Sequence, residues 1–381
     1  MNSYYGYEVG PIRPPSEAYS LLVRVTRNCQ WNRCSFCPVY KTSEFSLRNV
    51  DDIIHDIDLV SKHLLKIRDT FDSPMNATPQ QLWDLTKQVD PLELPAFDYA
   101  LKWFRDGMTS VFLQDADALL MGTYDIVKIL EHLRENFPWI DRVTTYSRSS
   151  TLNKMSDEEL MHIKNAGLTR VHVGLESGSD SVLKLVKKGA SKDIHIKAGQ
   201  RVRRVGLELS EYVMPGLGGR ELSHEHAIET ADALNQIDPH FIRLRPLALT
   251  PRAPLYQVYE HGDFHRINDI DLTRELITLI ENLDAITSRI VSDHILNLFT
   301  DIEGQMPNDR GRLIEKLQRF LDLDSENQLL YRLGRRLNIF EKIDDMQNTG
   351  RLERVRMIVR DQGVNAGNID QIIDSLMARF I

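Results

Sequence analysis

Three cysteines lie within nine residues, in the segment Asn28-Cys29-Gln-Trp-Asn-Arg-Cys34-Ser-Phe-Cys37, and the 381-residue sequence has no others. An odd number of thiols this close together cannot form a disulfide framework, so the cluster indicates a metal site in a reducing compartment. Iron–sulfur clusters are usually held by four cysteine thiolates. Three thiolates on a four-iron cluster would leave one iron open, where the amino and carboxylate groups of a cofactor could bind.

A structural zinc site is the alternative interpretation of these thiols. Zinc in such sites takes a closed set of four ligands, so a histidine such as His55 would have to complete a Cys3His set. His55 is out of phase with the apolar residues of its predicted helix, which indicates a solvated side chain. The spacing therefore favours the iron–sulfur cluster over zinc.

Short apolar and β-branched runs alternate with helical patterns from residue 21 onward. The strands predicted from these runs are 21–26, 110–113, 142–146, 170–175, 207–213 and 241–244. The predicted helices are 51–67, about 124–137, 156–167, 181–187, 192–205 and 222–236. Strands separated by helices predict a parallel sheet with right-handed crossovers. Six repeats predict the α/β class, with a partial (β/α)6 barrel of the TIM type.

Two regions depart from this alternation. Residues 68–100 lack clean periodicity and carry four prolines, so we interpret them as an insertion. Beyond Pro254 the apolar residues recur only at helical spacing. We therefore expect a barrel domain over residues 1–255 and an all-helical C-terminal extension over residues 256–381.

Composition restricts the partners and the location. The 42% apolar and 27% charged residues are ordinary for a folded globular protein. The net charge of −8 and the lack of a long basic run make nucleic acid an unlikely partner. Residues 1–15 do not form a secretory signal, and no apolar run approaches the roughly 20 residues of a membrane span. We expect a cytoplasmic protein that makes no membrane contact.

The cysteine loop resembles that of the radical S-adenosylmethionine (SAM) superfamily, in the branch of oxygen-independent coproporphyrinogen oxidase and the methylthiotransferases. The matching residues are Val25-Thr-Arg-Asn-Cys29 and Cys34-Ser-Phe-Cys37-Pro38. The commonest loop of that superfamily is C-x3-C-x2-C, and the longer first gap here leaves the subfamily open. The resemblance implies that the three cysteines ligate a [4Fe–4S] cluster and that Phe36 packs near the adenine of SAM.

Two further segments carry the same resemblance. Leu113-Gln-Asp-Ala-Asp117 occupies the place of the family's Gly-Gly-Glu segment, which implies that Asp115 or Asp117 receives the amino group of SAM. The alternative is a turn at a strand end with solvated acids. Tyr212-Val-Met-Pro-Gly-Leu-Gly-Gly219 is similar to the family's glycine motif, in which Gly216 would let the backbone approach the purine closely.

The segment Val173-Gly-Leu-Glu-Ser-Gly178 resembles the family's G-[VLI]-[EQ]-S segment, and its distance to Lys187-Lys188-Gly189 also fits. The resemblance implies that Glu176 contacts SAM and that Lys188 pairs with its carboxylate. The alternative for Lys188 is a lysine at a helix end that is favourable to the helix dipole and needs no ligand.

The resemblance implies an enzyme that cleaves SAM reductively to a 5′-deoxyadenosyl radical, which abstracts hydrogen from an unknown substrate. Such an enzyme needs an electron donor, for example a flavodoxin or a ferredoxin. Two alternatives stay open: a non-catalytic iron–sulfur or heme-binding relative, and a zinc-binding interaction protein.

The substrate itself is not identified by the sequence. Arg243 and Arg245 alternate along the sixth predicted strand, and residues 146–148 end the third. Paired arginines suit an anionic small molecule, although salt bridges within the barrel would explain them equally well. His224 and His226 cannot share one helix face, so we expect both to be solvated.

Overall fold

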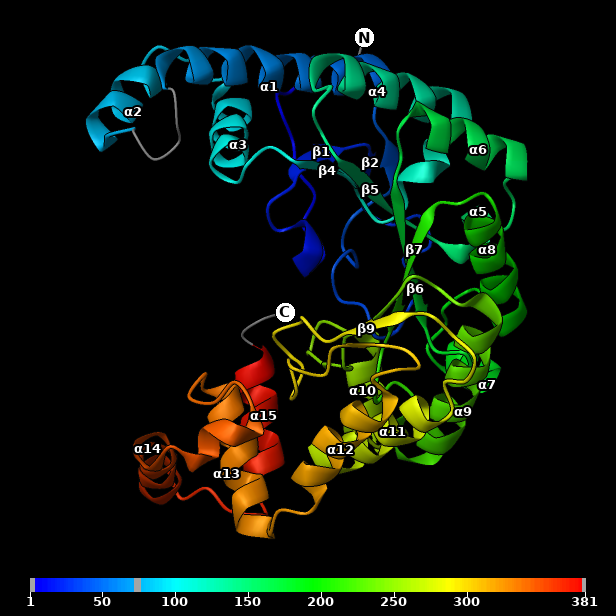
Figure 1. Cartoon of the computed structure of the whole chain (residues 1–381), viewed down its shortest axis with the longest axis vertical. Coiled ribbons are helices and arrows are strands. Elements are labelled where there is room, and N and C mark those ends of the chain that lie inside the picture. Colours follow the sequence, from blue (N-terminus) through cyan, green and yellow to red (C-terminus); the bar gives the residue numbers. More distant parts are fainter. Residues whose placement is uncertain (1–3, 72–76, 379–381) are drawn as a thin grey trace. The chain divides into compact units, whose positions relative to one another are not determined.

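The computed structural model describes residues 4–71 and 77–378, so part of the predicted insertion, residues 72–76, lies outside the described residues. The chain divides into two compact units. The first comprises residues 1–30, 42–173 and 204–208, and the second comprises residues 31–41, 174–203 and 209–381. Each unit is described by itself (Figure 1).

The first unit contains a set of parallel strands in the order β1–β4–β5–β6. Their bounds are Leu21–Arg24 for β1, Ser110–Gln114 for β4, Arg142–Ser147 for β5 and Arg170–Glu176 for β6. Leu21 of β1 pairs with Val111 of β4, and Thr144 of β5 pairs with Arg170 of β6. The last three residues of β6 belong to the second unit.

Helices α1 (Val50–Thr70), α4 (Thr123–Asn136) and α6 (Asp157–Ala166) lie next to one another in this unit (Figure 1). The side chain of Asn49 caps α1 by accepting the backbone N–H of Asp51. The apolar face predicted for α1 is buried: Ile53, Ile57, Val60, Leu64 and Ile67 are each at most 1% exposed. This unit also contains α5 (Ser149–Leu152) and the short antiparallel pair of β2 (Thr26–Arg27) and β3 (Ser46–Leu47).

The region interpreted as an insertion contains α2 (Pro79–Thr86) and most of α3 (Leu94–Arg105), which the sequence did not predict. Helix α3 buries Phe97, Trp103 and Phe104. Prolines lie in the first turns of both helices, where the missing N–H costs nothing, so they mark helix starts and not a loop. That the region is an insertion stays a prediction.

The second unit contains the strands β7 (Glu208–Val213, from Leu209 onward), β8 (Phe241–Leu244), β9 (Arg289–Val291) and β10 (Gly304–Gln305), in that order. The first three are parallel, and β10 is antiparallel to β9. The expectation of an all-helical extension is wrong for β9 and β10. Strands of two or three residues are too short to show the alternation by which a strand is recognised in a sequence.

The remaining elements of the second unit are helical. Three helices complete the β/α alternation: α7 (Asp180–Leu185), α8 (Lys192–Arg204) and α9 (Gly219–Ile237). The C-terminal helices are α10 (Pro254–Glu260), α11 (Asp269–Glu281), α12 (Arg310–Leu321), α13 (Ser325–Arg336), α14 (Thr349–Asp361) and α15 (Ile369–Met377). All six predicted strands are present, which confirms the α/β partial (β/α)6 barrel with a helical C-terminal region.

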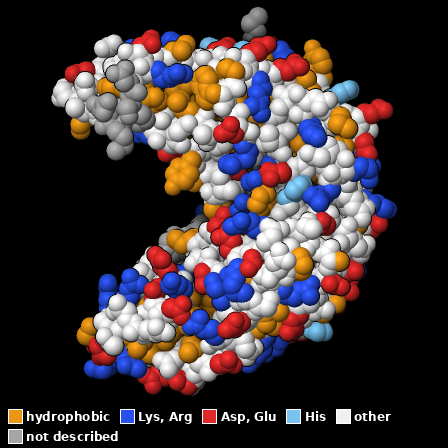
Figure 2. Space-filling view, in the orientation of Figure 1, with side chains coloured by type: hydrophobic (Ala, Val, Ile, Leu, Met, Phe, Trp, Pro, Cys, Tyr) orange, Lys and Arg blue, Asp and Glu red, His pale blue; other side chains and the backbone are white. Residues whose placement is uncertain are grey.

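The distribution of surface charge and the apolar character of the helices are relevant to the partners of this protein. Acidic and basic side chains are interspersed over the face shown in Figure 2, and no continuous basic stripe crosses it. Within residues 4–71 and 77–378, no helix combines the length and the apolar character that crossing a lipid bilayer requires.

A close backbone contact joins the segment after β6 to α9. The N–H of Gly178 donates to Oγ1 of Thr230 at 2.9 Å, and a Cβ at Gly178 would lie 2.2 Å from the carbonyl oxygen of Glu229. Position 178 therefore requires glycine, because the opposing atom is backbone and cannot turn away.

We expect Gly178→Ala to lower the free energy of unfolding by roughly 1–3 kcal/mol, because the added methyl overpacks this contact. Gly311→Ala is the matched control, since position 311 lies in α12 with no atom within 4 Å of an added Cβ. This control should raise the stability by up to about 1 kcal/mol, because alanine is the better helix former. Urea unfolding measures both variants, and an equal effect of the two would contradict the role of the contact.

Candidate functional site

In the first unit, the two predicted acids hold the residues on either side of Cys29. The N–H of Asn28 donates to Oδ2 of Asp115 at 3.4 Å, and Nε2 of Gln30 donates to Oδ2 of Asp117 at 3.3 Å. The β2–β3 pair closes the loop, because Thr26 pairs with Leu47 across it. Both acids are buried, so the alternative of a turn with solvated acids is wrong.

The two acids differ in their partners. Asp115 is ion-paired with Arg24 at 3.2 Å. Asp117 accepts from neutral donors, namely Ser147 Oγ at 2.8 Å, Thr151 Oγ1 at 2.6 Å and the amide of Gln30. Burial raises the pKa of Asp117 to about 6, although the two hydroxyls, the backbone N–H of Arg148 and the charge of Arg148 partly offset this effect. Asp117 therefore differs from Asp115 in that the side chains that donate hydrogen bonds to it are neutral, although the charge of Arg148 also acts on it.

In the second unit, the rest of the cysteine loop is anchored to the end of α7. Nε1 of Trp31 donates to the carbonyl of Lys187 at 2.8 Å, and the N–H of Ser35 donates to the carbonyl of Val186 at 2.9 Å. The Trp31 ring lies against Gly189, where a Cβ would be only 2.3 Å from the ring. Trp31 is thus a positioning residue that the sequence analysis did not identify.

Cys34 and Phe36 are buried in an apolar cluster of this unit. The other buried members of the cluster are Val182, Val186, Met214, Leu217, Leu247, Leu249, Leu255 and Phe264. Cys37 packs against the cluster and is only partly buried. The loop residues therefore have a fixed apolar support in the second unit.

The structure brings Glu176, Lys188 and Phe36 together. Nζ of Lys188 lies 3.0 Å from Oε1 of Glu176 and 5.9 Å from the centre of the Phe36 ring. Lys188 is buried, with 8% of its surface exposed, so its side chain turns inward and is not merely a solvated group at a helix end. A Cβ at Gly174 would lie 2.3 Å from Glu176 Oε1 and 2.9 Å from Lys188 Nζ, so glycine makes room for the pair.

Glu176 has a left-handed backbone, with φ at +63°. A non-glycine residue with this conformation carries strain, and such residues concentrate at functional sites. The carbonyl of Glu176 accepts the N–H of Met214 at 2.9 Å. That hydrogen bond helps to hold the carboxylate at the carboxyl end of β6.

Glu211 on β7 is a further acid that the sequence analysis missed. It is 1% exposed, and burial raises its pKa well above the usual value, opposed by Lys188 and reinforced by Glu176. Its Oε2 has no hydrogen-bond partner among the described residues. A signal for it existed in the sequence, since Glu211 lies inside the apolar run 207–213 that predicted the strand.

Other predicted residues have partners that the sequence did not reveal. The N–H of Gly216, at φ +83°, donates to Oε1 of Glu275 at 2.6 Å. Arg243 is ion-paired with Asp293 at 2.6 Å, as the salt-bridge alternative expected, whereas Arg245 is only partly buried. His226 is buried and bonded to Ser177 Oγ at 2.8 Å.

The expectation of a solvated histidine is therefore wrong for His226, whereas His224 is exposed. The reason is that His226 faces the segment after β6, where Ser177 and the carbonyl of Met214 offer it hydrogen bonds.

The three cysteines are free thiols, and so suit thiolate ligation. Cys29 belongs to the first unit, and Cys34 and Cys37 belong to the second. Among the described residues, no three or more His, Cys, Asp or Glu side chains are gathered as a metal ion would require. His55, the candidate fourth ligand for zinc, is exposed, with its ring edge-on against Tyr4 at 4.7 Å.

Part of this chain is similar in sequence to individual proteins of known kind. It is 27% identical to a tRNA uridine(34) acetyltransferase of Methanocaldococcus infernus over 168 residues, which is 42% of this chain and 30% of that protein. It is 23% identical to the heme chaperone HemW of Bacillus subtilis over 180 residues, 46% of each. The chain thus spans less than half the length of these relatives.

Among solved structures, coproporphyrinogen III oxidase from Escherichia coli aligns with a TM-score of 0.45 and 14% identity, over 69% of this chain and 52% of that one. The sequence model of the radical SAM superfamily, a superfamily of enzymes, matches residues 23–232. That range is more than half of the 381 residues and contains all three cysteines. The chain belongs to the radical SAM superfamily.

Proposed function

We propose that this chain holds a [4Fe–4S] cluster on Cys29, Cys34 and Cys37 and binds SAM at the iron that the three thiolates leave open. The observation that carries this proposal is the superfamily match, whose range includes all three free thiols. When bound, the cluster supplies the electron that cleaves SAM into methionine and a 5′-deoxyadenosyl radical, which takes hydrogen from a substrate.

In this proposal Lys188 binds the carboxylate of SAM and Glu176 accepts its ribose hydroxyls. A buried ammonium forms a strong charge-assisted hydrogen bond, because water does not compete with the ligand. Glu211 supports this role, because burial raises its pKa well above the usual value and so favours its uncharged form near Lys188. Phe36 beside the adenine and Gly216 beside the purine stay predictions.

Asp117 is our candidate for the acceptor of the amino group of SAM. Asp115 already has a direct ion pair with Arg24, whereas the described side chains that donate hydrogen bonds to Asp117 are neutral and Arg148 acts on it through its charge. The hydroxyls of Ser147 and Thr151 hold the Asp117 carboxylate in one orientation, which suits a fixed ammonium contact. The sequence could not distinguish Asp115 from Asp117 as the acceptor of the amino group, and this proposal chooses Asp117.

The partners are inferred from the chemistry. Superfamily members need a reductant, and we propose a flavodoxin or a ferredoxin as the donor. We place the protein in the cytoplasm, because free thiols and a thiolate-held cluster need a reducing compartment. The interspersed charges on the face shown in Figure 2, together with the net charge of −8, support a small-molecule substrate over nucleic acid. Arg243 is engaged by Asp293, so Arg245 is the better candidate of the two for an anionic substrate.

A relative that keeps the cluster without cleaving SAM is the second candidate. The match to a heme chaperone supports it. Formation of 5′-deoxyadenosine separates the two candidates.

We expect the anaerobically reconstituted protein to show iron–sulfur absorption and, with dithionite and SAM, to form 5′-deoxyadenosine. Cys34→Ser should reduce both to background, because the cluster loses a ligand. Ser35→Ala is the matched control from the same loop, since the Ser35 hydroxyl has no hydrogen-bond partner among the described residues. It should keep both properties. A cluster that never cleaves SAM would support the second candidate, and a colourless zinc protein would refute both.

Lys188→Met should weaken SAM binding by roughly ten- to a hundredfold, the value of a charge-assisted hydrogen bond of about 1.5–3 kcal/mol. Lys187→Met is the matched control, because Lys187 is adjacent but exposed. It removes the same charge and should leave the affinity unchanged. Equilibrium binding of SAM to the reconstituted protein measures both, and equal losses would show that only the overall charge matters.

The SAM affinity of the wild type should fall below about pH 6, by about tenfold per pH unit, because protonation removes the charge of Asp117. The sign follows from the raised pKa: the carboxylate is ionised above about pH 6 and neutral below it. Asp117→Asn should bind SAM weakly at every pH, with a flat profile over this range. Asp125→Asn, an acid elsewhere in the first unit, should keep the wild-type profile; a flat wild-type profile would exclude Asp117.

A further inference from the structure

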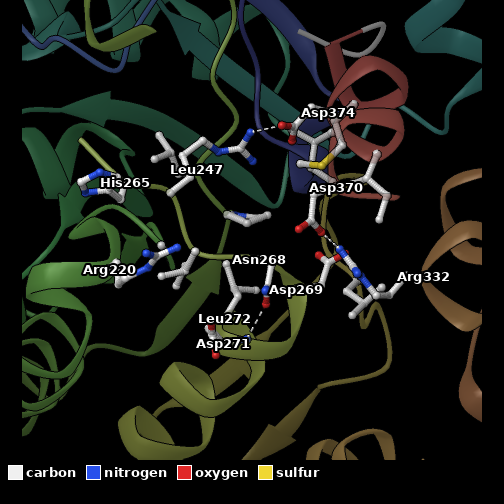
Figure 3. Close-up of a pocket in the computed structure, with 18 of the residues that line it drawn as sticks. Arg220, Leu247, His265, Asn268, Asp269, Asp271, Leu272, Arg332, Asp370 and Asp374 are labelled. Carbon is white, nitrogen blue, oxygen red and sulfur yellow. Dashed lines mark hydrogen bonds and ion pairs between the residues drawn. The ribbon is translucent and has the colours of Figure 1, made fainter. Parts of the chain in front are cut away.

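A cavity of about 260 Å³ lies wholly within the second unit. It is bounded by the segments that follow β7 and β8, by the start of α11, and by α13 and α15 (Figure 3). Its volume is close to the lower limit of small-molecule sites, roughly 300–1,000 Å³. The carboxyl ends of parallel strands are also where α/β folds bind ligands.

One wall of the cavity is a network of paired charges. Asp269 accepts from Nε of Arg332 at 2.9 Å and from NH2 of Arg336 at 3.0 Å, and all three side chains are about nine-tenths buried or more. Arg332 also pairs with Asp370 of α15. Burial raises the pKa of Asp269, but the two arginines outweigh it and the net pKa is lowered, so the carboxylate stays ionised. These ion pairs hold the side chains of this wall in place, and each charge of the wall is paired with an opposite one.

Two more ion pairs neutralise the remaining acids that line the cavity. Arg266 binds Asp374 at 2.5 Å, and Asp271 binds Arg274 at 2.7 Å. His265 bonds to Glu221 at 2.7 Å. Every acid that lines the cavity is therefore matched by a basic partner.

Arg220 on the opposite side is different (Figure 3). Its backbone N–H donates to the carbonyl of His265 at 2.7 Å, but its exposed guanidinium has no ion pair or hydrogen bond among the described residues. It lies in the first turn of α9, whose partial positive charge adds to its own. The carboxylate of Glu221 acts on Arg220 through its charge but is hydrogen-bonded to His265. Arg220 is therefore a lining cation that no carboxylate of the described residues contacts directly.

The surface between these two sides is largely apolar. It is formed by Leu247, Leu272, Leu296, Leu298, Ile373 and Met377. An apolar body that fills this space would be released from water, and a polar one would leave its groups unpaired.

We propose that this cavity binds a small amphipathic carboxylate, with the carboxylate on Arg220 and the apolar body between the leucines. A guanidinium fork matches the geometry of a carboxylate. A phosphate dianion fits less well, because only one lining guanidinium lacks a direct ion pair among the described residues and the carboxylates of Asp370 and Asp374 lie on the opposite side. An organic cation fits worst, since each lining acid already has a basic partner. None of the cysteines lines the site, so it does not depend on the proposed cluster.

The test uses hexanoate as the probe on the full chain, with hexanol and hexylamine as neutral and cationic controls of the same length. Calorimetry should show hexanoate binding at least about tenfold tighter than either control, the effect of one charge-assisted contact. Binding should weaken as salt rises, because Arg220 is exposed. Arg220→Gln should lose about tenfold in hexanoate affinity. Arg354→Gln, an exposed arginine of α14 outside the cavity, should lose none.

Several outcomes would overturn the proposal: no binding of hexanoate, equal binding of hexanol, or the same affinity in Arg220→Gln and in the wild type. Leu272→Trp, which fills the cavity, should abolish hexanoate binding, and unchanged binding in a folded Leu272→Trp would place the ligand elsewhere. Cys29→Ser, which removes a proposed cluster ligand that belongs to the first unit, should bind hexanoate as the wild type does. That result separates a failure of this site from a failure of the cluster proposal.

Discussion

A buried ammonium group must be neutralised, and in the second unit this requirement joins several segments of the chain. Lys188 meets Glu176 at 3.0 Å because the chain at Glu176 takes a left-handed turn and because Gly174 leaves space beneath the pair. Gly189 follows directly and admits the Trp31 ring, which hydrogen-bonds the carbonyl of Lys187. The ion pair and the position of the cysteine loop are thus consequences of one local arrangement.

The same requirement for a partner applies to the buried acids near Cys29. Asp115 and Asp117 are buried, and each is supplied with donors: a guanidinium for the first, hydroxyls and an amide for the second. Because a buried carboxylate without donors is costly, these contacts also order the backbone on both sides of Cys29. The loop therefore has protein anchors at its ends that do not depend on a metal.

The C-terminal helices follow a different rule. Their apolar faces form one large core, in which Phe299, Phe320, Tyr331 and Phe340 are stacked or packed edge to edge. Into this region the chain also buries Asp269, Arg332 and Arg336. Buried ion networks repay their desolvation only when every member is paired, so they restrict how α11, α13 and α15 pack. On this side, the cavity is bounded by charged side chains that already form ion pairs with one another.

The sequence by itself determined the α/β alternation, the face of α1 and the cysteine cluster, because periodicity and spacing are local properties. The resemblance also named Glu176 and Lys188 as separate contacts of SAM, and only the structure showed that they pair with each other. Among the elements that the sequence missed were α2, α3, β9 and β10, because β9 and β10 are very short and the prolines at the starts of α2 and α3 suggested a loop. Tertiary structure alone decided which groups are desolvated and which are matched by a partner. It separated Asp117 from Asp115, buried His226, brought Glu211 beside Lys188 and left the Arg220 guanidinium without a direct ion pair among the described residues, since burial and pairing depend on contacts between residues far apart in the chain.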